Sequence, residues 1–346
     1  MSSCDLLALS LLTFTTVSAL LILLTLTKKM RQVPKGYWKE IGTVSNLYIY
    51  PLKSSRYQSL PVAVTTGKGL KEIRNDDLLV LSDRIFVAFR ADTADFVSGR
   101  TFPNFLGITV TSVSSDSVEF AFKGKEPLRV RVPSGFNNEE LKMWFGERIP
   151  TADCGDEASK WITDVLGVES PVRMGYWSKS ISGRREVKNF HKEKAEYYNM
   201  KNEYTGSYSD ISSYLLINES SVKDINSRLT PGSTQVSHMN FRPNIHISGP
   251  RAFAEDEWKW LKIGEKAVFR VFSPCPRCSF VTIDPETMSK DSNMEPLKTL
   301  KTFRLATEER QRRIEGSAPF MGVHLGLYEE GVVAVGDSVY ISEKFV

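Results

Sequence analysis

Two cysteines in a C-x-x-C arrangement are the residues of this sequence best suited to chemistry. Cys275-Pro276-Arg277-Cys278 stands between apolar runs at residues 267–272 and 280–283. A thiolate can serve as a nucleophile, a redox partner or a soft metal ligand, and a neighbouring guanidinium favours the ionised form. The motif permits a transition-metal thiolate site, a structural zinc site, a thioredoxin-like couple, or two buried cysteines used as small apolar side chains.

The surroundings of the motif favour some of these alternatives over others. A zinc site needs two further ligands, and the sequence has no second C-x-x-C and no close histidine pair. A thioredoxin-like pair begins a helix, whereas the β-branched residues after Cys278 predict a strand at 280–283. Spacing alone does not decide between a soft metal ligand and two structural cysteines.

The rest of the sequence excludes several other function classes. It contains no G-x-G-x-x-G, no G-x-x-x-x-G-K-[ST], no G-x-S-x-G and no H-E-x-x-H. The 4 histidines are scattered, which disfavours a histidine metal site or a serine triad. With 45 basic and 41 acidic residues, the net charge of +4 does not indicate a nucleic-acid partner. The 4 cysteines are too widely spread for a disulfide framework, so we expect a reducing compartment.

Short apolar runs separated by turn residues must position these groups. Strands are predicted at residues 44–50, 60–65, 78–81, 85–89, 108–113, 118–122, 128–132, 244–248, 258–263, 267–272, 280–283 and 332–341. Three- and four-residue spacings predict helices at 156–166 and 218–229. Residues 178–202 are basic and poor in apolar side chains, so they predict a surface connection between two halves.

The elements together predict an α+β fold that is predominantly β. We expect a β-barrel-like N-terminal domain at residues 42–177 and a second β-barrel domain at 203–346, with helices on the outside. The 346 residues exceed one typical domain, and a hydrophobic content of 41% suits a folded core.

The start of the chain predicts a membrane anchor. Residues 6–27 carry no charge and are long enough to cross a bilayer as one transmembrane helix, with a linker at 28–41. A cleaved signal peptide is the alternative, but Asp5 stands where a basic n-region is expected. Lys28, Lys29 and Arg31 follow the span and place the folded part on the cytosolic side. This pattern suits the mitochondrial outer membrane, with the endoplasmic reticulum as the alternative.

A series of short motifs runs along residues 42–340. It comprises Tyr50-Pro51-Leu52-Lys53-Ser54, Asp83-Arg84, Asp153-Cys154-Gly155, Tyr208-Ser209-Asp210, Asn240-Phe241-Arg242-Pro243-Asn244, Arg277-Cys278 and Val281-Thr282-Ile283-Asp284-Pro285. In type and order these motifs resemble the mitochondrial amidoxime-reducing component family. That family belongs to the MOSC (molybdenum cofactor sulfurase C-terminal) domain proteins, and the resemblance covers nearly the whole chain beyond the anchor.

The resemblance implies a molybdenum-molybdopterin cofactor (Moco) whose metal is bound by the Cys278 thiolate. Guanidinium, ammonium and hydroxyl groups suit the phosphate and polar edge of the pterin. The resemblance assigns this cofactor-binding role to Lys53, Ser54, Arg84, Ser212, Arg242, Asn244 and Arg277. It makes Asp210 a catalytic candidate beside the substrate.

The same resemblance implies a reaction and partners. The reaction is the reduction of N-hydroxylated compounds such as amidoximes, hydroxylamines and N-hydroxylated bases. Electrons would come from cytochrome b5, which its NADH-dependent reductase reduces in turn. The alternatives are a molybdenum-cofactor carrier and a sulfur-transfer MOSC protein, although the sulfurases carry a pyridoxal-phosphate domain for which we expect no room here.

Three positions depart from the family pattern. Ile211 follows Asp210 where the family usually has threonine, and Pro276 replaces a small polar residue between the cysteines. Ser55-Arg56-Tyr57 stands where the family has Cys-Lys-Gly. These positions bear on substrate range and cofactor affinity more than on the identity of the cofactor.

Overall fold

The computed structural model describes residues 37–135, 139–178, 180–181 and 185–342. The predicted transmembrane helix at 6–27 and most of the linker lie outside these residues. Within the described part, none of the helices has the length and apolar character needed to cross a bilayer. Residues 38–342 belong to one compact unit.

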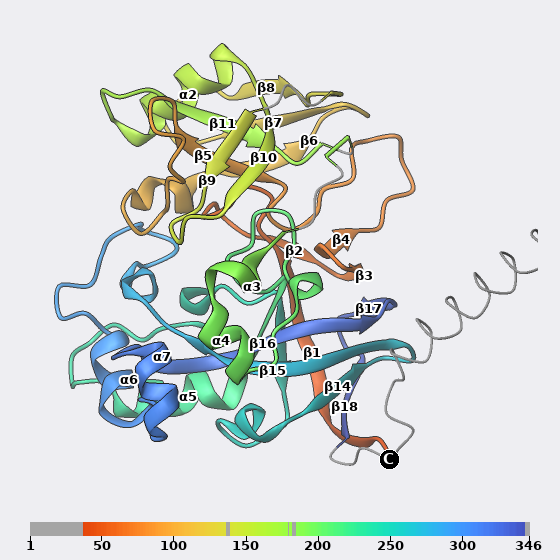
Figure 1. Ribbon diagram of the computed structural model, residues 1–346, viewed down its shortest axis with the longest axis vertical. Coiled ribbons are helices and arrows are strands. Elements are labelled where there is room, and N and C mark those ends of the chain that lie inside the picture. Colours follow the sequence, from red (N-terminus) through yellow and green to blue (C-terminus); the bar gives the residue numbers. More distant parts are fainter. Residues whose placement is uncertain (1–36, 136–138, 179, 182–184, 343–346) are drawn as a thin grey trace, which may run out of the picture. The chain divides into compact units, whose positions relative to one another are not determined.

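Seven strands of this unit form a closed β-barrel (Figure 1). Around the ring, seven strands pair in the order β13 (Ile245–Ser248), β12 (Tyr214–Asn218), β16 (Phe320–Glu329), β15 (Ala267–Pro276), β14 (Trp260–Ile263), β18 (Ser338–Ser342) and β1 (Lys39–Ile49). The pairing of β1 with β13 closes the ring, and β2 (Gln58–Leu60) extends β1 outside it. All neighbours in the ring are antiparallel except β12 and β13. Strand β1 thus comes from the N-terminal half of the sequence but completes a ring of C-terminal strands.

Alternating apolar residues fill the barrel. Ile245 and Ile247, like Leu261 and Ile263 on β14, are fully buried with one residue between them. Side chains two residues apart on a strand lie on the same face, so both pairs contribute to one core. The period-two pattern of these runs is therefore the reason that they form barrel strands.

Three smaller sheets and helix α2 (Asp156–Leu166) account for most of the remaining N-terminal half, and one of these sheets also includes the C-terminal strand β17 (Val332–Ala334). One sheet has β5 (Phe86–Arg90), β11 (Val172–Tyr176), β10 (Arg148–Asp153) and β9 (Glu139–Lys142). The others are β6 (Thr109–Ser112), β7 (Ser117–Ala121) and β8 (Leu128–Arg131), and β17, β3 (Val62–Thr66) and β4 (Gly69–Glu72). Helix α2 packs on β11 and ends at Gly167, whose φ of 65° permits a left-handed cap. The prediction of a helix at 156–166 is confirmed.

The other helices are short. They are α3 (Val187–Phe190), α4 (Lys192–Tyr197), α5 (Glu219–Arg228), α6 (Leu297–Phe303) and α7 (Glu309–Glu315), with 3-10 turns η1 (Pro103–Gly107), η2 (Asn202–Tyr204), η3 (His238–Phe241), η4 (Ala254–Glu257) and η5 (Ser279–Thr282). Of these, α5, α6 and α7 lie together on one side of the barrel strands (Figure 1). The helix predicted at 218–229 is confirmed as α5, which Asn218 caps by accepting a hydrogen bond from the Ser220 N–H. The predominantly β fold with helices on the outside is confirmed.

Other sequence predictions were wrong. Residues 280–283 fall in η5 and its end rather than in a strand, because Val281 packs into a side cluster with Leu297 and Leu300. This packing outweighs the β propensity of the segment. No strand forms at 78–81, and the strand expected at 332–341 is divided into β17 and β18.

Residues 178–202 are not only a surface connection. Their described part contains α3 and α4 and buries Arg185, Val187 and Ala195. Because the segment is poor in apolar residues, its composition did not indicate that a few of them would pack against the body of the protein.

Candidate functional site

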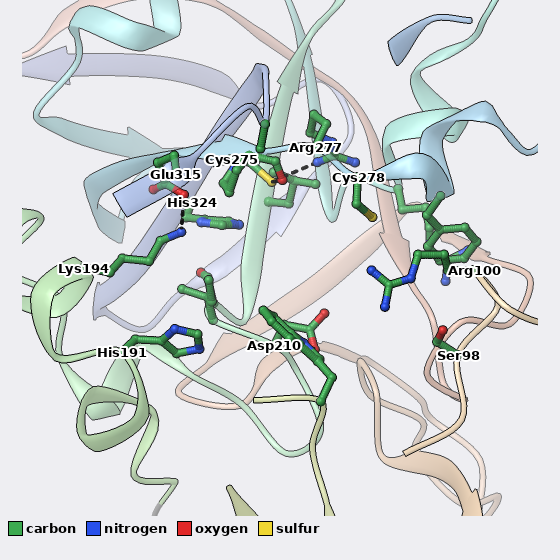
Figure 2. Close-up of a pocket in the computed structure, with 18 of the residues that line it drawn as sticks. Ser98, Arg100, His191, Lys194, Asp210, Cys275, Arg277, Cys278, Glu315 and His324 are labelled. Carbon is green, nitrogen blue, oxygen red and sulfur yellow. Dashed lines mark hydrogen bonds and ion pairs between the residues drawn. The ribbon is translucent and has the colours of Figure 1, made fainter. Parts of the chain in front are cut away.

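One cavity of about 740 Å³ collects every residue that the sequence predicted for the site (Figure 2). Those residues are Lys53, Ser54, Arg84, Asp210, Ser212, Arg242, Asn244, Arg277 and Cys278. Sequence reasoning missed other side chains of the lining, among them Ser98, Arg100, Trp144, Phe190, His191, Lys194, Glu315 and His324. In Figure 2, Lys194, Glu315 and His324 gather on one side of the cavity and Ser98 and Arg100 on another.

The two cysteines of the C-x-x-C motif have different surroundings. Strand β15 carries Cys275, whose side chain is buried, while Cys278 precedes η5 and leaves its thiol exposed in the cavity. Arg277 donates from Nη1 to the Sγ of Cys275 at 2.9 Å and from Nη2 to the Phe241 carbonyl at 2.7 Å. Cys278 is therefore the cysteine that can accept a soft metal from the cavity.

Arg242 is a second guanidinium in the lining. It follows η3 with a left-handed φ of 55° and stacks on the rings of Tyr50 and Phe280, 4.0 and 5.3 Å from their centroids. Its Nη2 is buried, and no described residue accepts a hydrogen bond from it. Burial lowers the pKa of Arg242 to about 10, so the guanidinium remains charged at neutral pH. A buried, charged donor without an acceptor suits an anionic ligand.

Arg84 adds a third guanidinium, which is held by a buried carboxylate. Asp83 has no exposed surface, pairs with Arg84 and accepts a hydrogen bond from the Tyr50 N–H at 3.0 Å. Arg84 also lies over the ring of Tyr50, 5.2 Å from the centroid. Tyr50 thus lies between Arg84 and Arg242 and helps to fix both.

Lys53 and Asp210 form an ion pair in the lining of the cavity. The Lys53 ammonium donates to the Asp210 Oδ1 at 2.9 Å and to the Tyr208 carbonyl at 2.8 Å. Burial lowers the pKa of Lys53 to about 8, and the Asp210 carboxylate opposes part of this shift. Partial desolvation raises the pKa of the half-exposed Asp210, but Lys53 and the indole N–H of Trp144 outweigh that effect and lower the pKa overall.

The side chains of the remaining predicted residues form hydrogen bonds with backbone groups of the cavity wall. Asn244 donates to the Tyr48 carbonyl and accepts from the Leu215 N–H, and Ser212 donates to the Leu325 carbonyl at 2.7 Å. Their side chains therefore fix the cavity wall in this structure.

A close approach to Gly99 places Ser54 in the wall. A Cβ at Gly99 would lie 2.9 Å from the ring of Phe280 and 3.1 Å from the Cβ of Ser54. A larger residue at position 99 would push one of them aside. Glycine there lets Ser54 and Phe280 line the cavity together.

The far wall carries groups that the sequence did not indicate. Lys194 on α4 donates to the buried carboxylate of Glu315 on α7 at 2.7 Å. Burial lowers the pKa of His324 on β16 to about 3 and also lowers that of His191, so both rings are neutral at pH 7. No sequence motif joins these residues, because they come from separate elements that meet only in the fold.

The cavity can hold an anion and a soft metal side by side. Lys53, Arg84, Arg242 and Arg277 supply positive charge around one exposed thiol. Among the described residues there is no group of three or more histidine, cysteine or acidic side chains that could bind a metal ion. Phosphate and a polar heterocyclic edge match the donors that these cations present.

Comparisons with known proteins match both halves of the chain. The model of the MOSC N-terminal beta barrel domain matches residues 41–169, and the model of the MOSC domain matches residues 203–340. Mitochondrial amidoxime reducing component 2 of Rattus norvegicus is 33% identical over 87% of this chain and 84% of its own length. Mitochondrial amidoxime-reducing component 1 is 32% identical in Mus musculus and in Homo sapiens, over 88% of this chain and 83% and 84% of theirs.

Proposed function

Because this chain belongs to the MOSC-domain family of the mitochondrial amidoxime-reducing components, we propose that it is a molybdenum-cofactor-dependent reductase of N-hydroxylated compounds. One observation carries the proposal: the exposed thiol of Cys278 shares a cavity with Lys53, Arg84, Arg242 and Arg277. The buried Nη2 of Arg242, without an acceptor among the described residues, adds the requirement for an anionic ligand.

The residues of the cavity fit molybdenum-molybdopterin. Cys278 would bind the metal as a thiolate, while Arg242, Arg277 and Arg84 would hold the phosphate and polar edge of the pterin. When bound, the cofactor supplies the electrons for the reduction. The reaction consumes two electrons and two protons per N–OH group and yields the N–H compound and water.

The protein orients the substrate and keeps charge in place. The Lys53 ammonium and the Trp144 indole both donate to Oδ1 of Asp210, which keeps the carboxylate ionised and fixed. With 49% of its side chain exposed, Asp210 can accept a hydrogen bond from an N–H or O–H group of the substrate. Lys53 Nζ, whose pKa of about 8 is close to neutral pH, holds a proton beside this carboxylate.

The proposed function also includes an electron donor and a membrane anchor. Cytochrome b5, reduced by its NADH-dependent reductase, is the proposed donor, and exposed Arg100 and Arg313 at the cavity offer charge to an acidic partner. Residues 6–27 would anchor the chain in the mitochondrial outer membrane, or alternatively the endoplasmic reticulum, facing the cytosol. Confinement to one membrane would raise the effective concentration of the partners.

The test compares the full-length chain with its Cys278→Ser variant, both purified from a host that makes molybdopterin. We expect near-stoichiometric molybdenum in the parent and reduction of benzamidoxime with NADH, cytochrome b5 and its reductase. Both should be lost in the variant, which circular dichroism should show to be folded. Bound molybdenum without turnover would indicate a cofactor carrier instead, and a parent without molybdenum would refute the proposal.

A further inference from the structure

We propose that Trp144 gives the cavity a wall that selects planar, conjugated N-hydroxy compounds and holds their polar end against Asp210. This inference rests on the proposed reductase function and specifies its substrate class. The aromatic wall consists of Trp144 and Phe190, which both line the cavity, with Phe145 and His191 packed against them.

Trp144 is unusually exposed for so large an apolar side chain. It lies in the loop between β9 and β10, and 59% of it is accessible although most large apolar residues of the protein are buried. Phe190, 43% exposed, is another such residue in the lining of the same cavity. Exposed aromatic surface in a concave polar site marks a place for a ligand.

The ring of Trp144 is held in position despite its exposure. Phe145 packs edge-to-face against it, with centroids 5.2 Å apart and planes at 88°. The centroid of the His191 ring lies 5.9 Å from that of Trp144. The indole N–H donates to Asp210 Oδ1 at 3.1 Å. A ring held by three contacts loses little conformational entropy when a ligand stacks on it.

The same hydrogen bond joins the wall to the candidate catalytic carboxylate. Trp144 and Lys53 both donate to Oδ1 of Asp210, and no hydrogen bond from a described residue reaches Oδ2. Oδ2 therefore remains available as an acceptor beside the aromatic wall. A substrate with a planar group next to its N–H or N–OH group can stack on the indole and donate to Oδ2 at once.

This geometry assigns the substrate class by its shape. An amidoxime conjugated to an aromatic ring, or an N-hydroxylated heterocycle, has its polar group in the plane of the ring. An aliphatic N-hydroxy compound can make only the contact with Asp210. Aromatic stacking typically contributes a factor of about three to ten in affinity beyond simple burial.

The test uses two amidines, which are products of the proposed reaction and are cationic at neutral pH. Benzamidine is planar and aromatic, and acetamidine is its aliphatic counterpart. Their binding to the molybdenum-loaded full-length protein is measured by isothermal titration calorimetry. We expect benzamidine to bind about five- to ten-fold more tightly than acetamidine to the parent.

Three variants separate the two roles of Trp144. Trp144→Leu removes the ring and the N–H, so most of the preference for benzamidine should disappear. Trp144→Phe retains an aromatic ring but removes the donor to Asp210, so the preference should remain. Because a donor to the ionised carboxylate is lost, the pKa of Asp210 should rise and the acidic limb of the pH–rate profile should move to higher pH. Phe190→Leu should weaken the preference and leave that limb unchanged.

The outcomes distinguish this inference from the proposed function. Turnover with an unchanged benzamidine preference in Trp144→Leu would overturn the aromatic wall and leave the reductase intact. An unmoved acidic limb in Trp144→Phe would overturn the link to Asp210. A third outcome is that the parent contains no molybdenum but still binds benzamidine selectively, and that Trp144→Leu loses this selectivity. It would support the aromatic wall and refute the proposed reductase function. Molybdenum content should be equal in all variants, which checks that the substitutions leave cofactor binding intact.

Discussion

The guanidinium of Arg277 donates to the Sγ of Cys275, 2.9 Å away, in the same C-x-x-C motif that leaves Cys278 exposed in the cavity. The buried cysteine therefore orients an arginine, whereas the exposed cysteine faces the space where a metal would lie. One motif supplies two different functions because β15 ends at Pro276 and the chain turns into η5 at Cys278.

This relationship predicts different losses when each cysteine is replaced. Cys275→Ala should leave Cys278 in place as the metal ligand but retain less of the molybdenum-molybdopterin cofactor, by a factor of a few, because Arg277 loses one of its two acceptors. Cys275→Ser should recover part of this loss, since its hydroxyl can accept the hydrogen bond. Molybdenum and pterin, which should fall together, are both measured on purified protein. Complete loss of the cofactor in Cys275→Ala, as in Cys278→Ser, would contradict a role of Cys275 that is limited to orienting Arg277.

The burial of Lys53 predicts a pH dependence of stability. Its pKa falls from 10.5 in the unfolded chain to about 8 in the folded one, mainly through burial. Between these pH values the folded state releases a proton that the unfolded state keeps, so the free energy of unfolding rises with pH. Relative to Lys53→Met, the cofactor-free parent should gain up to about 3 kcal/mol between pH 8 and 10.5. Urea denaturation at several pH values measures the free energy of unfolding of both proteins. A difference between parent and variant that does not change with pH would contradict the lowered pKa of Lys53.

A buried ion pair supports the loop that carries Asp210. Arg185 donates to Glu147 at 2.7 Å and, through Nη1, to the carbonyls of Gly206, Ser207 and Ser209. Arg185→Met would leave Glu147 buried without its ionic partner, so we expect a loss of about 3–5 kcal/mol in the free energy of unfolding. Urea denaturation provides the measurement.

The exposed pair of Arg131 and Asp116 is the control for this prediction. The Arg131 side chain is 82% exposed, so Arg131→Ala should cost less than about 1 kcal/mol. Adding Glu147→Leu to Arg185→Met should recover part of the stability, because no unpaired charge then remains buried. If Arg185→Met lowered the free energy of unfolding as little as Arg131→Ala does, Arg185 would not be an important support of the loop.

Local patterns predicted the elements that are regular. Residues 156–166 form a helix with the predicted bounds, since apolar side chains at helical spacing and Gly167 agree with each other. Residues 280–283 were wrongly predicted as a strand. Their β-branched side chains are compatible with a strand or a turn. Because Val281 packs against Leu297, the segment forms the 3-10 turn η5.

The sequence by itself predicted which residues could bind a cofactor, because their motifs resemble those of a known family and because guanidinium groups and a thiol suit that chemistry. From Lys53 to Cys278, every predicted site residue lines the same cavity. The tertiary structure alone decided that Trp144 donates to Asp210 and that Lys194 pairs with Glu315, since these partners lie on separate elements without a shared motif. It also decided which cysteine is exposed. Burial, contact and access to the cavity are properties of packing between distant segments, and no local pattern of residues specifies them.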